Sequence, residues 1–185
     1  MTNDDLARTV AELVDRQQIA DVIVTAARAG DRADVELMKD CYHPDAYEDH
    51  GYFRGNAHEF VDQALKLQVE RYQSANHWLN PPLIQLDGDR AYTETYVQAT
   101  MIGNEDAERR TLGFAGRYLD TFERRDGRWR IAQRITVCDY VTSERLSGPQ
   151  WPWGDEPVFV VGKQGKGDPA YLMAQPAALR DAPRG

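Results

Sequence analysis

Apolar side chains recur with helical spacing at the start of this 185-residue chain. They stand at Leu6, Val10, Leu13, Val14, Ile19, Val22, Ile23 and Ala26, a helical spacing that places them on one side of a helix. Asn3 or Asp4 is a plausible N-terminal cap, and Gly30 is a plausible stop. The pattern therefore predicts one long helix that ends at Gly30.

The same spacing returns twice before residue 73. It predicts a short helix from about 34 to 41 and a longer helix over 56–72, with a short strand and turn over 45–53 between them. Two hairpins follow, over 83–101 and 113–141, and each contains an Asp-Gly pair of the kind favoured in tight turns. Helices followed by long strands indicate an α+β fold with a curved antiparallel sheet.

The composition changes after residue 146. We expect one domain over 1–146 and a Trp/Pro/Gly-rich C-terminal tail over 147–185 that packs on the domain or on a neighbouring subunit. Trp151 and Trp153 lie in a proline-framed loop of this tail. The loop is expected to be a strap on the outer face of the sheet, a subunit contact or a lid over a pocket.

Overall composition is that of an ordinary globular protein, with 42% hydrophobic and 28% charged residues. The net charge of −8 argues against nucleic-acid binding. Cys41 and Cys138 stand far apart and outside any metal-ligand spacing. No run is long enough to span a membrane, and the acidic N-terminus does not resemble a signal peptide, so we expect a cytoplasmic protein without a membrane partner.

Two residues are candidates for acid–base chemistry. Asp31 follows the glycine at the end of the first helix, and His77 stands where a polar stretch becomes an apolar strand. A carboxylate that orients an imidazole is the minimum equipment for removing a proton from carbon. The alternatives are a histidine bonded to backbone and an aspartate that caps the second helix. Asp34 is better placed for that capping role.

Arg134 is a candidate for stabilising a developing anion. Strict strand alternation places it opposite Trp129, Ile131 and Gln133. Small residues on its own face leave room for a ligand beside it. An outer-face arginine at a subunit contact is the alternative.

Three stretches resemble the SnoaL-like branch of the nuclear transport factor 2-like superfamily: 29–34 (AGDRAD), 42–46 (YHPDA) and 118–129 (YLDTFERRDGRW). The resemblance implies a cone-shaped α+β barrel in which three N-terminal helices pack on a curved antiparallel sheet. Asp31 and His77 stand where scytalone dehydratase and hexachlorocyclohexane dehydrochlorinase keep a catalytic Asp–His pair, and bile acid dehydratases look similar. The dehydrochlorinase also implies a pocket role for Arg134.

Further pocket residues follow from the same comparison and from strand placement. His50 stands near the position of a pocket tyrosine of scytalone dehydratase, so this chain lacks that tyrosine. The substrate-binding residues that we predict are His50, Tyr47, Tyr96, Tyr118 and Cys138. No metal site is expected, because the four histidines do not form a recognised ligand spacing. There is also no nucleophile elbow and no phosphate-binding loop.

The sequence thus predicts a cofactor-independent lyase that performs dehydratase-type elimination on a small cyclic or hydrophobic molecule. His77 is the expected base, Asp31 orients it, and Arg134 or His50 assists departure of water or another anion. The alternatives are an isomerase or cyclase of the same fold and a non-catalytic protein, either ligand-binding or like a dioxygenase small subunit. We expect a homo-oligomer, a trimer rather than a dimer.

Overall fold

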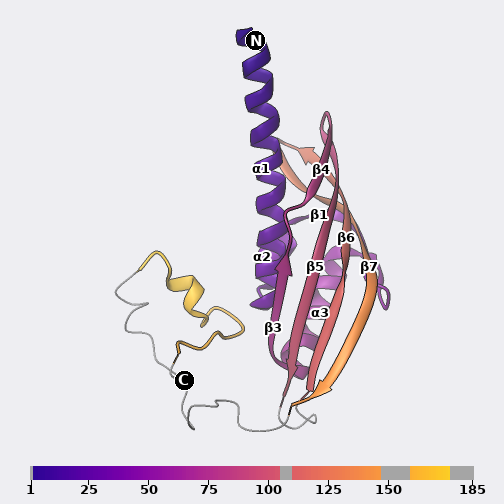
Figure 1. Ribbon diagram of the computed structural model, residues 1–185, viewed down its shortest axis with the longest axis vertical. Coiled ribbons are helices and arrows are strands. Elements are labelled where there is room, and N and C mark those ends of the chain that lie inside the picture. The colour runs from indigo at the N-terminus through magenta and orange to yellow at the C-terminus, as the bar shows by residue number, and fades with distance from the viewer. Residues whose placement is uncertain (1, 105–109, 147–158, 176–185) are drawn as a thin grey trace.

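The computed structural model describes residues 2–104, 110–146 and 159–175. In these ranges three α-helices pack against one face of a curved sheet (Figure 1). The helices are α1 (Asn3–Asp31), α2 (Val35–Asp40) and α3 (Ala57–Arg71), and the short 3-10 helix η1 (Pro169–Leu172) lies in the C-terminal segment. The predicted α+β class is confirmed, including the three N-terminal helices.

Within the described residues the sheet has seven strands. They are β1 (Tyr42–Asp49), β2 (Arg54–Asn56), β3 (Tyr72–Leu79), β4 (Leu83–Asp87), β5 (Arg90–Gly103), β6 (Arg110–Arg125) and β7 (Arg128–Arg145). Their order is β2-β1-β7-β6-β5-β3, and β4 pairs with β5 outside this path. The strands β4 to β7 pair in antiparallel fashion as expected, whereas the β1–β7 pair is parallel, so the sheet is mixed. No tight turn joins these two strands, so no local signal fixes their relative direction.

The ends of α1 differ from the sequence prediction. Thr2 is the cap, and it forms a reciprocal capping box with Asp5. The helix passes through Gly30 and ends at Asp31, and Ala33 then takes a left-handed conformation with φ of 51°. The extension matters because it makes Asp31 the last residue of a rigid helix.

Only the second half of α1 contributes to the core. Its buried side chains pack with α3 and with the inner face of the sheet; the central members are Ile19, Ile23, Phe60, Val61, Leu65, Phe122, Trp129 and Ile131. The N-terminal end of α1 projects beyond the sheet (Figure 1), and the apolar residues Leu6, Val10, Leu13 and Val14 in the first half of the helix are exposed.

A bulge on β7 changes which side chains face the core. Phe122 pairs with Ile131 and Thr121 with Gln133, so Ala132 is an extra residue in β7. Alternation shifts by one position at this point. Ile131 and Arg134 are consequently both buried, at 0% and 4% exposure. The predicted separation of these two residues onto opposite faces is wrong, because strict alternation assumes an unbroken ladder.

The described part of the tail contacts the junction between α1 and α2. Asp168 forms an ion pair with Arg32, with 3.0 Å between Oδ1 and Nε. Asp34 accepts hydrogen bonds from Lys166 and from the Tyr171 hydroxyl. Trp151 and Trp153 lie outside the described residues. Among the helices of the described ranges, none combines the length and apolar character needed to cross a membrane.

Candidate active site

Asp31 and His77 form a two-point contact. The Asp31 Oδ1 atom lies 2.7 Å from His77 Nδ1, and Oδ2 accepts a hydrogen bond of 3.1 Å from the His77 backbone N–H. Both side chains are mostly buried, at 13% and 20% exposure. A carboxylate accepts the Nδ1 proton, which leaves Nε2 of the neutral imidazole with a free lone pair. The arrangement can accept a proton.

Local structure explains why the two groups meet. His77 lies on β3 opposite Ala99 of β5, and it shares the inner face of β3 with buried Ala75. Its neighbours Asn76 and Trp78 point to the opposite face and are exposed. Since Asp31 ends α1, which packs along β3, its carboxylate reaches the strand backbone and the imidazole at once.

A cavity of about 330 Å³ opens on the Asp31 side of the pair. Its walls come from Asp31 and Arg32, from residues 73–76 of β3, and from residues 161–164 of the tail. The tail therefore forms one wall of this hollow, which Asp31 lines and His77 does not.

Arg134 is bound by a buried carboxylate. Its Nε and Nη2 atoms donate to the two Asp120 oxygens, each at 2.7 Å. The guanidinium also lies over the ring of Tyr118, 4.0 Å from its centroid. Burial lowers the pKa of Arg134, but Asp120 more than offsets this and holds it well above the ordinary value. Arg134 is therefore permanently charged, and that charge is paired.

Glu48 is a buried acidic residue that we did not predict from the sequence. It is 0% exposed, and its Oε1 lies 3.0 Å from Nδ1 of His50. Thr136 Oγ1 lies 3.1 Å from the same ring nitrogen. Glu48 is also the Cα partner of Arg134. Ala46 and Glu48 are buried on one side of β1, and Tyr47 between them is exposed.

Tyr118 links the two histidine sites electrostatically. Burial raises the pKa of its hydroxyl, the charges of Glu48, Asp120 and Asp31 raise it further, and Arg134 opposes them. Asp31 and Glu48 thus act on the same phenol. Asp31 is paired with His77, and Glu48 is paired with His50.

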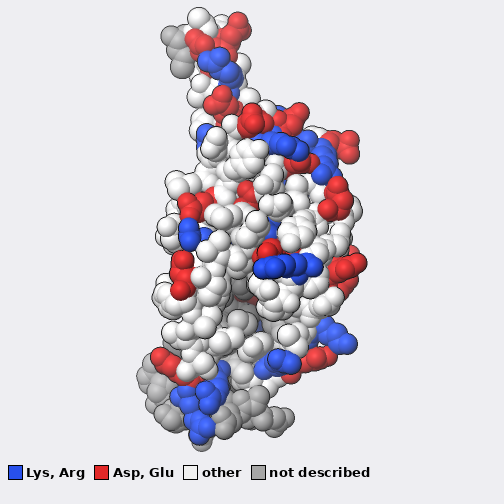
Figure 2. Space-filling view, turned by 90° about the vertical axis from the view of Figure 1, so that its right-hand side faces the viewer, with Lys and Arg blue, Asp and Glu red and all other residues white. Residues whose placement is uncertain are grey.

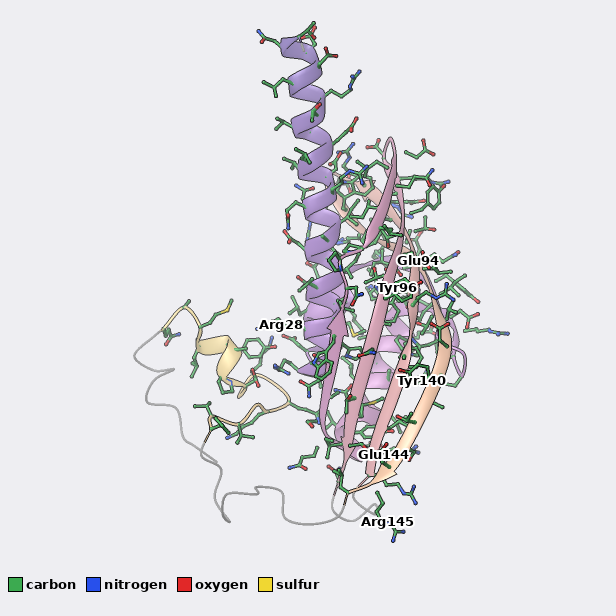
Figure 3. The ribbon with its side chains drawn as sticks, viewed as in Figure 1. Arg28, Glu94, Tyr96, Tyr140, Glu144 and Arg145 are labelled. Carbon is green, nitrogen blue, oxygen red and sulfur yellow. The ribbon has the colours of Figure 1, made fainter. Side chains whose placement is uncertain are left out.

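Three of the predicted substrate-binding residues lie elsewhere. Tyr47 and Tyr96 are 41% and 53% exposed, and Cys138 is exposed as well. Tyr96, with Glu94 and Tyr140, lies on the outer side of the sheet (Figure 3). Acidic and basic side chains are interspersed on the side of the molecule shown in Figure 2. Of the eight predicted site residues, the structure brings five to the inner side, namely Asp31, His50, His77, Tyr118 and Arg134.

Potential metal ligands do not gather in the described parts of the chain. No group of three or more His, Cys, Asp or Glu side chains there is arranged to hold an ion. His43, for example, is buried and its Nε2 lies 3.0 Å from the Glu123 carbonyl oxygen.

Comparison with known proteins gives a family match. The model of the SnoaL-like domain matches residues 11–135. No curated protein sequence matches the chain.

Solved structures share the fold at low sequence identity. A scytalone dehydratase-like protein from Novosphingobium aromaticivorans is 18% identical, with a TM-score of 0.67 over 76% of this chain and 94% of that chain. A type 3 hexachlorocyclohexane dehydrochlorinase from Novosphingobium barchaimii is 17% identical, with a TM-score of 0.66 over 76% and 99%. A protein of unknown function from Mycobacterium tuberculosis is 19% identical, with a TM-score of 0.60 over 71% and 75%. At these identities the likeness establishes the fold alone.

Proposed function

This chain belongs to the SnoaL-like domain family, and from that premise we propose that it is a cofactor-independent lyase. The observation that carries the proposal is the two-point contact of Asp31 with His77. It fixes the tautomer and the orientation of the imidazole, as required of a general base. The dehydratase-like and dehydrochlorinase structures of the same fold support an elimination reaction.

In the proposed reaction, Nε2 of His77 removes a proton from a carbon of a small cyclic or otherwise hydrophobic substrate. Asp31 stabilises the imidazolium that forms, because its carboxylate faces Nδ1 at 2.7 Å. The electron pair of the C–H bond becomes the new double bond, and water or another anion departs. Arg134 or His50 assists that departure.

The test is turnover of hydroxylated and halogenated cyclic compounds by the purified full chain. Products are identified by mass, because elimination removes a small molecule whereas isomerisation or cyclisation of the same substrate does not. His77→Gln and Asp31→Asn should each lower the rate by on the order of 10²- to 10⁴-fold. Wild-type rates in both folded variants would refute the mechanism.

Binding without turnover would instead favour the non-catalytic alternative. Isothermal titration of the same compounds distinguishes the two cases. A protein that binds them tightly but releases them unchanged is a ligand-binding module.

A further inference from the structure

The inner face of the sheet carries a row of polar residues on four neighbouring strands. Thr93, Asp120, Arg134 and Glu48 are successive Cα partners across β5, β6, β7 and β1. All four are buried. A buried row of this kind is costly unless its members bind one another or a ligand.

The acidic members of this row have different partners. The two Asp120 oxygens accept hydrogen bonds from Arg134. Glu48 is 0% exposed, and its Oε1 lies 3.0 Å from Nδ1 of the His50 imidazole. A buried acidic side chain is tolerated only with such a partner.

Several polar atoms of the same region lack a hydrogen-bond partner among the described residues. They include Glu48 Oε2, the Tyr42 hydroxyl and Thr95 Oγ1, and each of these atoms is buried. Thr95 is the Cα partner of Tyr118, and Tyr118 is the partner of Thr136, which contacts His50. Unpartnered buried donors and acceptors favour a ligand that itself carries hydroxyl groups.

We propose that Glu48 and His50 form a second proton-transfer pair, in which His50 protonates a leaving hydroxyl group and Glu48 positions His50. The proposal rests on the lyase function above and narrows its substrates to hydroxylated compounds. It also selects His50 over Arg134 as the residue that assists departure of the leaving group. Arg134 is already paired with Asp120, and a guanidinium cannot donate a proton.

The step balances in atoms and charge. His77 takes the proton from the substrate carbon, and the C–H electron pair forms the C=C bond. The C–O bond breaks, its electron pair goes to oxygen, and the Nε2 proton of His50 joins that oxygen as water. Exchange with solvent then removes the proton from His77 and returns one to His50. Hydroxide is a poor leaving group and needs this proton, whereas chloride does not.

The experiment compares leaving groups. Pairs of 3-hydroxy and 3-chloro cyclic ketones, beginning with cyclohexanone and extended to alkyl- and aryl-substituted rings, are tested for enone formation with the full chain. We expect the wild type to convert hydroxy compounds. His50→Gln should lose on the order of 10²- to 10⁴-fold in kcat/KM on the hydroxy member. It should lose less than about 10-fold on the matched chloro member, because departing chloride needs no proton.

Two variants and a control make the result specific. Glu48→Gln keeps the side-chain shape but removes the charge, so it should show the same selective loss; it also serves if His50→Gln does not fold. His77→Gln should lose activity on both the hydroxy and the chloro member of each pair. His43→Gln is the matched control, because His43 is bonded to the Glu123 backbone carbonyl instead. It should retain both activities.

The outcomes separate the two proposals. Equal losses of His50→Gln on hydroxy and chloro substrates, or wild-type conversion of chloro compounds only, would overturn the role of His50 and leave the lyase proposal standing. If the folded wild type converts no member of any pair, the lyase proposal fails and this inference fails with it.

Discussion

Asp31 holds both the ring and the backbone of His77, with one carboxylate oxygen on Nδ1 at 2.7 Å and the other on the backbone N–H at 3.1 Å. One side chain therefore orients the imidazole and also ties the end of α1 to β3. The geometry of the candidate dyad and the packing of helix on sheet share this contact.

Asp31→Ala should consequently affect both activity and stability. It leaves the His77 N–H without its acceptor, a loss of about 1–3 kcal/mol in unfolding free energy. Asp31→Asn keeps an oxygen for the backbone N–H, so it should lose activity with a smaller loss of stability. Chemical denaturation of both variants checks this. Asp62→Asn is the control, since Asp62 is exposed and forms a surface ion pair with Lys39; equal stability of Asp31→Ala and wild type would contradict the structural role.

Breaking the Arg134–Asp120 pair should destabilise the protein strongly. Asp120→Asn leaves a buried guanidinium without its counter-charge, and loss of one partner of such a pair costs about 3–5 kcal/mol. Arg134→Lys should also destabilise, because an ammonium cannot reproduce the two parallel hydrogen bonds.

The matched control for this pair lies on the outer side of the sheet. Arg117 pairs with Glu94 and Asp139, and all three are partly exposed. Arg117→Lys should barely shift the denaturation midpoint. A similar shift for the Arg117 and Arg134 variants would show that burial does not strengthen the inner pair.

The tail contact at Asp34 should weaken in acid. Burial raises the pKa of the Asp34 carboxyl, but hydrogen bonds from Lys166 and Tyr171 more than offset this and lower it overall. A carboxyl group whose pKa is lower in the folded state than in the unfolded state stabilises the folded state. This contribution is fully present above the unfolded pKa of about 3.9 and is lost as the pH falls below that value through the folded pKa. Wild type should therefore exceed Asp34→Asn in Tm at pH 7.

Lowering the pH should make these two proteins converge. The Tm difference should shrink as pH falls through about 4 and below, where wild-type Asp34 becomes protonated. Hydrogen exchange of residues 159–175 under the same conditions reports whether the tail is released. A Tm difference that stays constant between pH 7 and pH 3 would show that the charge of Asp34 is not the cause.

Gly116 stands at a second irregularity of the ladder and should not tolerate a side chain. A Cβ at this position would lie 2.0 Å from the Val137 carbonyl oxygen, which is backbone and cannot rotate away. Gly116→Ala should destabilise by about 1–3 kcal/mol or more. Gly30→Ala is the contrast, because its Cβ would meet nothing closer than the Met38 sulfur at 4.0 Å. Equal denaturation midpoints for the two variants would disprove the predicted clash.

The first half of α1 should mediate self-association. A short helical segment without packing partners is marginally stable in water. Leu6, Val10 and Leu13 also follow the four–three spacing of residues at the interface of paired helices. They are 47%, 49% and 60% exposed. Leu13→Asp should lower the molar mass measured by light scattering, whereas Asp62→Asn should not. An unchanged mass would place the contact elsewhere, and the wild-type value tests the expected trimer.

The sequence alone determined the local elements and the candidate dyad. The turn at Asp126 and Gly127 has φ of 51° and 74°, as an Asp-Gly hairpin turn requires, and Asp34 caps α2 as expected. Such features depend on a few neighbouring residues, so a short stretch of sequence specifies them. The pairing of Asp31 with His77 was also foreseeable, through the family resemblance carried by residues 29–34 and the other matching stretches.

Only the tertiary structure decided how the inner face is charged. The bulge at Ala132 turned Arg134 inward, and the parallel pairing of β1 with β7 placed Glu48 beside it. Neither follows from alternation, because a bulge and a non-local strand pair arise from packing between distant segments. Burial then gave the Glu48 side chain His50 as its partner, since a polar group removed from water must be satisfied within the fold.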